Sequence, residues 1–266
     1  MKDNFDALKR LKYIGRSIPV AMTPISEVFV GYPLTGRSQP SQARELVRGP
    51  KTNTIRTNVT DREQLEKGSP ALLLYPAIVP VDNVIVASNG AQTELLYSGV
   101  RNNPGLTKNV DGLKEIIELS FSEPAFRYDQ KDDRWIDITT YEPDAPNNTP
   151  RISLIANNDS AVLYIVRCVK GEKDEEYHPF KLEPGKGKVI TTYKGYNEDP
   201  LLPFTGEPLD IGIGSESVKD ITESLYEAIY GGQNPGDNYR VAAAGMLKKG
   251  DGSFDTITIN RSERGN

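Results

Sequence analysis

The sequence contains a single cysteine, Cys168, and a single histidine, His178. One cysteine cannot form a disulfide within the chain. A zinc site made of cysteine and histidine is excluded, and a Ser-His-Asp triad could use only His178 as its base. We predict that Cys168, in the apolar stretch LYIVRCV, is a core residue and that His178, in EEYHPF, lies in a solvated loop. Any chemistry must therefore rest on Arg, Tyr, Glu, Asp, Asn, Lys and backbone groups.

Long apolar runs are also lacking. No run approaches the roughly 18 residues that a membrane span needs, and MKDNFDALKRLKYIG lacks the uninterrupted apolar region of a signal peptide. The net charge is −5 and the pI is near 5.2, so the overall field repels nucleic acid and anionic membranes. We therefore expect a cytoplasmic protein with no nucleic-acid or membrane partner, in which local cations capture any phosphate ligand.

The remaining composition is typical of a globular protein, with 37% hydrophobic and 26% charged residues in a chain of 266, enough to bury a sizeable core. About eight to ten strands, mostly in hairpins, and two long helices are expected. Because alternation of strands and helices is lacking, the fold class predicted is α+β, with antiparallel sheets covered by helices. No break in composition divides the chain, so we expect one domain over residues 1–266.

Several segments have clear patterns. Hairpins are predicted for 13–22 with 26–34, for the two runs within 75–90, for 151–157 with 161–169 and for 239–249 with 254–262. A further strand is expected at 187–196, and helices over 109–121 and 218–229, the second ended by Gly231-Gly232. Residues 39–69 are polar with few apolar anchors, which is typical of a long binding loop.

The stretch from Tyr75 to Glu94 is the centre of the prediction. It reads as two buried strands joined by a polar turn, and the second strand ends at Ser88-Asn89-Gly90. Asparagine and glycine tolerate left-handed backbone angles, so the chain can turn sharply there and present an amide side chain with free N–H groups. An ordinary loop at a strand end is the alternative.

Two Gly-Arg-Ser triplets, at 15–17 and 36–38, accompany the first hairpin. An arginine offers a bidentate fork to phosphate and a serine adds a hydroxyl donor. We expect Arg16 and Arg37 to converge on one anion, unless they are ordinary surface arginines. GIGSES, at 212–217, is a weaker hint of an anion-holding turn before a helix.

Acidic residues gather before the third hairpin. Glu142 and Asp144 lie in a Pro/Asn-rich segment just ahead of Arg151. Side chains on such a loop can reach into a cleft; simple solvation of the loop is the alternative.

These motifs resemble, in order, those of the archaeal-type IMP cyclohydrolase family. They are YIGR, GRSQP, the tyrosine-to-SNG strands followed by Thr93, TYEPD before NTPRI, TTY and YRVAAA. The resemblance implies a four-layer α-β-β-α sandwich like that of the N-terminal-nucleophile hydrolases, without the terminal nucleophile. It also implies closure of the purine ring of 5-formamidoimidazole-4-carboxamide ribonucleotide to IMP, with no metal or cofactor. The expected partner is therefore a purine nucleotide.

The resemblance also implies roles for individual residues. Tyr75 and Glu142 are expected to transfer protons, and Asn89, with nearby N–H groups, to hold the base or the oxyanion. The expected substrate-binding residues are Arg16, Arg37 and Ser38 at the 5′-phosphate, together with Gly90, Thr93 and Arg151. For Arg151 the alternative is that it organises Glu142.

The sequence departs from the family pattern at two positions. Pro76 stands where members can carry an asparagine, and Gln92 where a histidine can follow SNG. A second interpretation therefore remains open, namely a catalytically altered purine-nucleotide-binding or regulatory protein on the same scaffold. Hydrolysis of another amide ranks last because no nucleophile favours it. The sequence leaves association into a homo-oligomer open.

Overall fold

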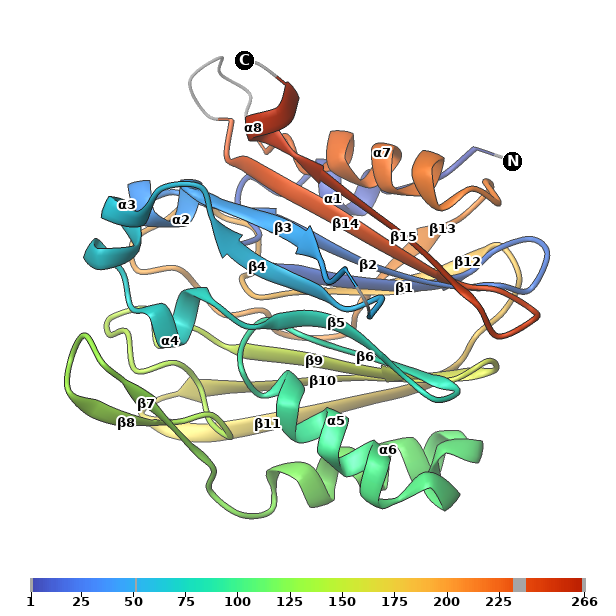
Figure 1. Cartoon of the computed structure of the whole chain (residues 1–266), viewed down its shortest axis with the longest axis horizontal. Coiled ribbons are helices and arrows are strands. Elements are labelled where there is room, and N and C mark those ends of the chain that lie inside the picture. Colours follow the sequence, from blue (N-terminus) through green and yellow to red (C-terminus); the bar gives the residue numbers. More distant parts are fainter. Residues whose placement is uncertain (1, 51, 232–237, 265–266) are drawn as a thin grey trace.

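Two large antiparallel sheets pack face to face in the computed structural model, which describes residues 2–50, 52–231 and 238–264 (Figure 1). The first sheet has the strand order β13 (Leu209–Gly212), β12 (Lys186–Thr191), β1 (Ser17–Met22), β2 (Val28–Thr35), β14 (Arg240–Lys248), β15 (Phe254–Asn260). The second has the order β11 (Glu172–Lys181), β10 (Ser160–Val169), β9 (Arg151–Ala156), β6 (Val84–Ser88), β5 (Pro76–Val81), β4 (Ile55–Val59), β3 (Arg44–Arg48).

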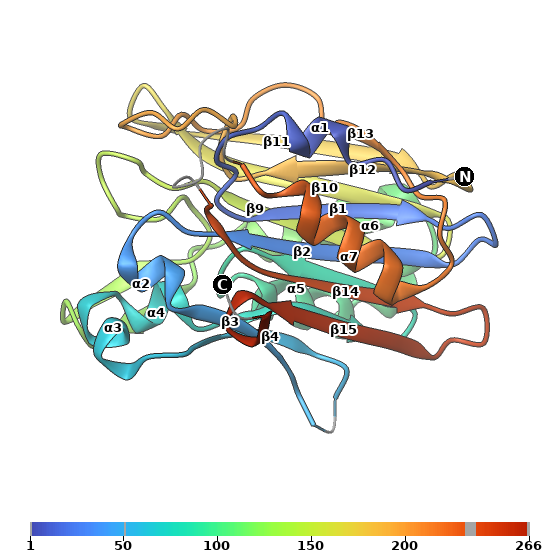
Figure 2. The same ribbon diagram turned by 90° about the horizontal axis from the view of Figure 1, so that it is seen from above.

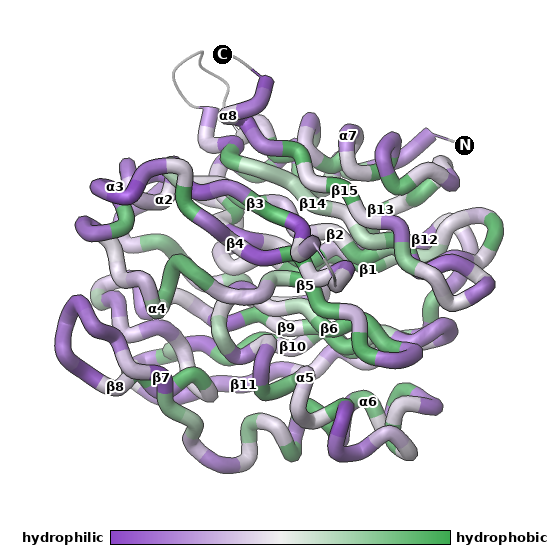
Figure 3. The backbone as a smooth tube through the Cα atoms, in the orientation of Figure 1, coloured by the Kyte–Doolittle hydropathy of each residue, from purple (hydrophilic) through white to green (hydrophobic). Residues whose placement is uncertain are grey.

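The main core lies between the sheets because successive side chains of a strand point to opposite faces. In β2, Val28 and Val30 belong to the core between the sheets, whereas Phe29 packs in the cluster on the outer face. In β9, Leu154 faces inward and Ile155 faces outward in the same way. Figure 3 shows apolar residues along the strands and polar residues along the loops at their ends.

Helices cover both outer faces. Figure 2 shows α7 (Val218–Ala228) lying across the first sheet, near the short helix α1 (Asp6–Lys9). On the second sheet lie α5 (Thr93–Asn102) and α6 (Val110–Phe121), whose apolar sides join the outer cluster of that sheet. Among the residues described, no helix has both the length and the apolar character needed to cross a membrane.

The remaining elements sit mostly at one end of the sandwich. They are α2 (Gln39–Gln42), α3 (Arg62–Lys67), α4 (Pro70–Leu73), the 3₁₀ helix η1 (Pro104–Lys108), the ribbon β7 (Phe126–Asp129) with β8 (Arg134–Asp137), and α8 (Arg261–Arg264). Of these, α2, α3 and α4 lie together where β2 ends (Figures 1 and 2).

The antiparallel α+β prediction is confirmed. All four predicted hairpins are present, as β1–β2, β5–β6, β9–β10 and β14–β15. The two predicted helices correspond to α6 and α7, and Asn109 caps the first by accepting a hydrogen bond from the N–H of Gly112. Of the predicted stop of α7, Gly231 has a positive φ of 72°, while Gly232 lies outside the described residues.

Several predictions of local structure were wrong. Residues 39–69 are not one long loop, because they contain β3 and β4, which extend the edge of the second sheet. In both strands only alternate residues are fully buried at the start and the rest are half-buried or exposed, so few apolar residues are needed, which explains the misleading composition. Edge position also explains His178, which lies in β11 rather than in a loop. Cys168, in β10, is partly exposed.

The number of elements was underestimated as well. Fifteen strands are present in the described part of the chain, and α5 was not predicted at all. The turn GIGSES does hold an anion, but an internal one. The backbone N–H groups of Gly214 and Ser215 each donate to Oδ1 of Asp3 at 2.8 Å.

Candidate active site

A cavity of about 450 Å³ opens at the end of the sandwich where α2, α3 and α4 lie. Its walls come from both sheets, from these short helices and from the segment before β9. The lining residues are Tyr13, Gly15, Arg16, Thr35, Ser38, Pro40, Ser41, Arg44, Lys67, Gly68, Ser69, Leu72, Leu73, Glu142, Asp144, Thr149 and Tyr193. Three of the nine predicted site residues, Arg16, Ser38 and Glu142, are among them.

Arg16 and Glu142 form a buried ion pair in the wall of this cavity. Nη1 of Arg16 donates to Oε1 of Glu142 at 3.0 Å and to the carbonyl oxygen of Asn89 at 2.8 Å. Burial alone would lower the pKa of Arg16, but Glu142 and nearby phenols outweigh it, so the pKa is raised well above its ordinary value. The guanidinium group therefore stays charged. Glu142 is only 4% exposed, so the simple loop-solvation alternative is wrong.

Arg151, the first residue of β9, lies behind Glu142 and does not line the cavity. Its Nη1 is 3.7 Å from Oε1 of Glu142, and its Nε donates to the carbonyl oxygen of Thr140 at 2.7 Å. Burial lowers the pKa of Arg151, with the positive charge of Arg16 acting in the same direction. This placement matches the alternative in which Arg151 organises Glu142.

Asn89 is held in the interior rather than presented to the cavity. Its Nδ2 donates to the carbonyl oxygen of Pro150 at 2.8 Å and to Oγ1 of Thr192 at 3.2 Å. Its Oδ1 accepts from the N–H of Ile152 and from Nε2 of Gln92. The amide has therefore used both donors and both acceptor sites, and the prediction that this turn presents its amide side chain to a ligand was wrong.

Gln92 completes a closed network that the sequence did not reveal. Its Nε2 donates to Asn89 at 3.0 Å and its Oε1 accepts from Nη1 of Arg151 at 3.2 Å. The links then run from Arg151 to Glu142, to Arg16 and back to Asn89. Because each side chain is held at two ends, the network fixes the orientation of Glu142 toward the cavity.

Gly90 and Thr93 lie behind the cavity with this network. A Cβ atom on Gly90 would come within 2.5 Å of Nη1 of Arg151 and of Oε1 of Gln92. Thr93 begins α5, and its hydroxyl donates to the carbonyl oxygen of Gly90 at 2.9 Å. Both residues therefore help to position the side chains behind the cavity and do not form its surface.

Tyr75 is fully buried and does not line the cavity. Its hydroxyl lies 2.9 Å from the hydroxyl of Tyr32, which is equally buried. Burial, followed by the neighbouring phenol, raises the pKa of Tyr32 well above its ordinary value. The phenol pair lies near Arg16.

Arg16 and Arg37 do not converge on one point, so that prediction was wrong. Arg37 does not line the cavity; its guanidinium lies 5.2 Å from the ring centre of Tyr13 and donates to the carbonyl oxygen of Glu198. Ser38 does line the cavity, and its Oγ caps α2 by accepting from the N–H of Ser41. Arg37 instead supports a wall through Tyr13.

Two cations in the lining were missed. Arg44 begins β3, is 6% exposed, and donates through Nε to Ser41 and through Nη2 to Thr35. Its Nη1 has no hydrogen-bond partner among the described residues. Lys67 ends α3 on the same side of the cavity. Both come from the segment predicted as a loop, where the number of basic residues was the only available signal.

Three further lining residues are joined by hydrogen bonds. Oγ1 of Thr149 donates to Oδ2 of Asp144 at 2.5 Å and lies 2.7 Å from the hydroxyl of Tyr193. Burial, and then the charge of Glu142, raise the pKa of Asp144. Burial also raises the pKa of Tyr193.

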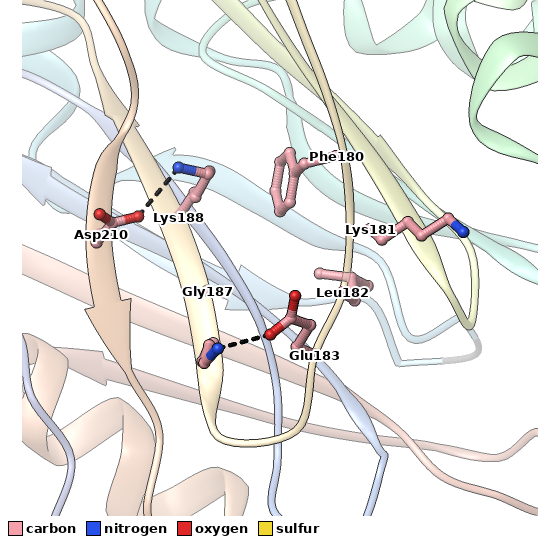
Figure 4. A pocket seen from close by; sticks show the side chains of 8 residues that line it. Phe180, Lys181, Leu182, Glu183, Gly187, Lys188 and Asp210 are labelled. Carbon is pink, nitrogen blue, oxygen red and sulfur yellow. Dashed lines mark hydrogen bonds and ion pairs between the residues drawn. The ribbon is translucent and has the colours of Figure 1, made fainter.

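A second groove, of about 330 Å³, lies between the end of β11 and strands β12 and β13 (Figure 4). Two of its lysines are already paired, Lys186 with Glu183 at 2.6 Å and Lys188 with Asp210 at 3.0 Å. None of the predicted site residues lines it. The cavity at Arg16 and Glu142 is therefore the candidate active site.

The family model of the IMP cyclohydrolase-like protein matches residues 13–112 and 132–252. The chain belongs to the IMP cyclohydrolase-like family. It is also similar to the IMP cyclohydrolase of Methanococcus maripaludis strain C7, with 26% identity over 185 residues, which cover 70% of this chain and 76% of the relative. With the IMP cyclohydrolase of Methanothrix thermoacetophila the identity is 23% over 189 residues, or 71% and 78% of the two chains.

Proposed function

We propose that this chain is an IMP cyclohydrolase, which closes the ring of 5-formamidoimidazole-4-carboxamide ribonucleotide to give IMP and water. The observation that carries the proposal is the family match, whose two segments contain Arg16 and Glu142. These two residues form an ion pair in the wall of one cavity. The substrate is a purine-nucleotide precursor, and a dehydration of this kind needs no redox cofactor.

The reaction places demands that this cavity can meet. The carboxamide nitrogen attacks the formyl carbon of the same molecule, so correct placement supplies much of the rate. The formyl oxygen gains negative charge and then leaves as water. It takes one proton from the carboxamide nitrogen and one from the formamide nitrogen, so the protein must move protons without a net gain or loss.

Glu142 is the proposed acceptor of the proton from the attacking nitrogen, and Arg16 the proposed donor to the developing oxyanion. Arg151, Gln92 and Asn89 would act through these two by holding them in place. The arrangement supports these roles because Glu142 and Arg16 both line the cavity and are held within hydrogen-bond distance of each other at low exposure.

The 5′-phosphate is proposed to lie on the side of Arg44 and Lys67, with the hydroxyl of Ser38 as a further donor. Charge-assisted hydrogen bonds contribute about 1.5–3 kcal/mol each, so two cations are a sufficient anchor. Arg37 would act indirectly, by holding the ring of Tyr13, which lines the cavity. Tyr75 would act from behind Arg16 rather than on the substrate directly.

The scaffold is proposed to be the four-layer sandwich of the N-terminal-nucleophile hydrolases, used without a terminal nucleophile. Helices on both outer faces of two packed antiparallel sheets support this assignment. The proposal includes one domain over residues 1–266, supported by a core that draws on strands from β1 to β14.

The decisive experiment follows ring closure of the formamido nucleotide by absorbance with the full chain. Glu142→Gln is expected to lower kcat about 10²–10⁴-fold, the usual contribution of a positioned acid or base. Glu183→Gln, in the separate groove of Figure 4, is the matched control and should retain wild-type turnover.

The same experiment tests the second candidate, a nucleotide-binding or regulatory protein. That candidate was motivated by Pro76 and Gln92, and neither residue lines the cavity. Tight binding of IMP by clean protein without any turnover would favour it over the enzyme.

A further inference from the structure

We propose that Tyr193, Thr149 and Asp144 form a proton relay, in which the hydroxyl of Tyr193 delivers a proton to the oxygen that leaves as water. The proposal rests on the proposed function and adds a catalytic residue to it, because Tyr193 is the member of the relay that would touch the substrate.

The three residues meet at the cavity from different parts of the fold. Tyr193 follows β12 of the first sheet, whereas Asp144 and Thr149 belong to the segment that leads into β9 of the second. All three line the cavity. The N–H and Oγ1 of Thr149 bind the two oxygens of Asp144, at 2.6 and 2.5 Å. The carboxyl group is therefore fixed, and Thr149 joins it to the phenol.

The direction of the hydrogen bonds depends on the charge of Asp144. When Asp144 is ionised, Thr149 donates to it and Tyr193 must donate to Thr149. When Asp144 is protonated, its O–H can donate to Thr149, Thr149 to Tyr193, and the phenol O–H is free to donate into the cavity. One proton added at the carboxyl group thus appears at the phenol without movement of a heavy atom.

The surroundings make Asp144 easier to protonate than an exposed aspartate and fix the phenol ring. Burial and the charge of Glu142 raise the pKa of Asp144, while Arg16 and the hydrogen bonds from Thr149 act in the opposite direction. The ring of Tyr193 is stacked on Tyr13, with 5.7 Å between centres and an angle of 23° between planes. The charged groups that face Tyr193 are again Arg16 and Glu142.

The protons balance over one turnover. Glu142 accepts a proton from the carboxamide nitrogen as the N–C bond forms and passes it to the oxyanion, which becomes a hydroxyl group. The relay donates a second proton to this hydroxyl as the C–O bond breaks and water leaves, and the phenol is refilled through Thr149 from Asp144, which is left ionised. Glu142 accepts the proton that the formamide nitrogen loses as the C=N bond forms. Both carboxyl groups line the cavity, and they return to their starting states when solvent water carries that proton from Glu142 to Asp144.

The test measures kcat, KM and the pH profile of ring closure for the full chain. Tyr193→Phe and Thr149→Val, which each interrupt the relay, should lower kcat about 10²–10⁴-fold with little change in KM. Because they break the same path, the double variant should lose no more than either single variant. Thr149→Ser keeps the hydroxyl and should recover most of the turnover that Thr149→Val loses.

The pH profile separates a relay from a purely structural role. The relay donates only while Asp144 is protonated, so wild-type kcat should fall as the pH rises through the pKa of Asp144. The residual activity of Tyr193→Phe should lack that fall. Tyr196→Phe is the matched control, since Tyr196 is 53% exposed and outside the cavity. Binding of IMP and thermal unfolding show whether each variant is folded.

The outcomes are distinct. Wild-type protein without turnover overturns both the proposed function and the relay. Active wild-type protein together with folded Tyr193→Phe or Thr149→Val of undiminished kcat overturns the relay alone. Losses that multiply in the double variant also overturn it, because they would show two independent contributions.

Discussion

Arg16 and Glu142 lie 3.0 Å apart although 126 positions separate them in the sequence. Arg16 leads into β1 of the first sheet, and Glu142 belongs to the segment that enters β9 of the second. Their ion pair therefore joins the two sheets in the wall of the candidate active site. Both residues are more than nine-tenths buried, so each charge depends on the other for compensation.

Replacing one member of this pair should cost more than replacing both. Arg16→Met leaves Glu142 buried with only Arg151 nearby, and breaking a buried pair from one side typically costs about 3–5 kcal/mol. Adding Glu142→Gln removes the uncompensated charge and should restore part of that loss. Urea unfolding of the wild type, both single variants and the double variant forms the thermodynamic cycle. Simple additivity of the two free-energy changes would contradict the pairing.

Gly90 should not tolerate a methyl group, although it lies outside the cavity. A Cβ atom there would come within 2.5 Å of Arg151 and Gln92, so Gly90→Ala must displace the side chains that hold Glu142. We expect a loss of about 1–3 kcal/mol in stability and a fall in kcat. Gly105→Ala is the matched control, because among the described residues no atom outside its own stretch of chain lies within 4 Å of the added carbon; its stability should change by less than about 1 kcal/mol. Equal effects of the two substitutions would show that crowding at Gly90 is not the cause.

Arg44 and Arg37 should differ in their effect on nucleotide binding. Arg44 lines the cavity, and its Nη1 has no hydrogen-bond partner in the part of the chain that the structure describes, whereas Arg37 lies over the ring of Tyr13 outside the lining. Arg44→Ala should weaken binding of IMP by about 1.5–3 kcal/mol, the value of a charge-assisted hydrogen bond, and Arg37→Ala by clearly less. Calorimetric titration with IMP and with inosine, which lacks the phosphate, separates the anchor from the rest of the site. The proposed placement of the phosphate is wrong if Arg37→Ala weakens binding of IMP more than Arg44→Ala does. It is also wrong if Arg44→Ala weakens binding of inosine as much as binding of IMP.

The sequence predicted the hairpins well because their signals are local. Apolar runs around Asp82-Asn83 and Asn157-Asn158 need no knowledge of the rest of the chain to be recognised as paired strands. Edge strands β3 and β11 were missed or misread because a half-exposed strand carries few apolar residues, and its pairing is decided by a neighbour that is remote in sequence.

The site was predicted in part for a similar reason. Residue type suggested that Arg16 and Glu142 carry chemistry, and they do share a cavity. The direction in which a side chain points depends on its partners, however. Asn89 turns inward because Pro150, Ile152 and Thr192 offer it a full set of hydrogen bonds. No pattern within the segment 88–90 contains that information.

At a different place, where β14 ends, a lysine spans the two sheets. Lys248 is 4% exposed, and its Nζ donates to the carbonyl oxygen of Asn83 and to Oδ1 of Asn158, at 2.6 and 2.5 Å. Both acceptors lie in turns of the second sheet. Burial lowers the pKa of Lys248, and the more distant charge of Asp159 opposes this only in part. The ammonium group thus connects the two sheets, but burial removes its hydration and disfavours its charged form.

The contribution of Lys248 to the free energy of unfolding should therefore increase with pH. A lysine whose pKa is lower in the folded state binds fewer protons there than in the unfolded state. In the interval between the two pKa values, stability rises with pH. The free energy of unfolding of the wild type, minus that of Lys248→Met, should therefore increase as the pH rises toward 10.5, the ordinary pKa of lysine.

The neighbouring Lys249 has a pKa that is raised through its hydrogen bond to Asp255, so the same difference for Lys249→Met should not increase. Urea unfolding at several pH values between 7 and 10 measures both differences, and a flat or falling curve for Lys248→Met would show that burial does not disfavour its charge.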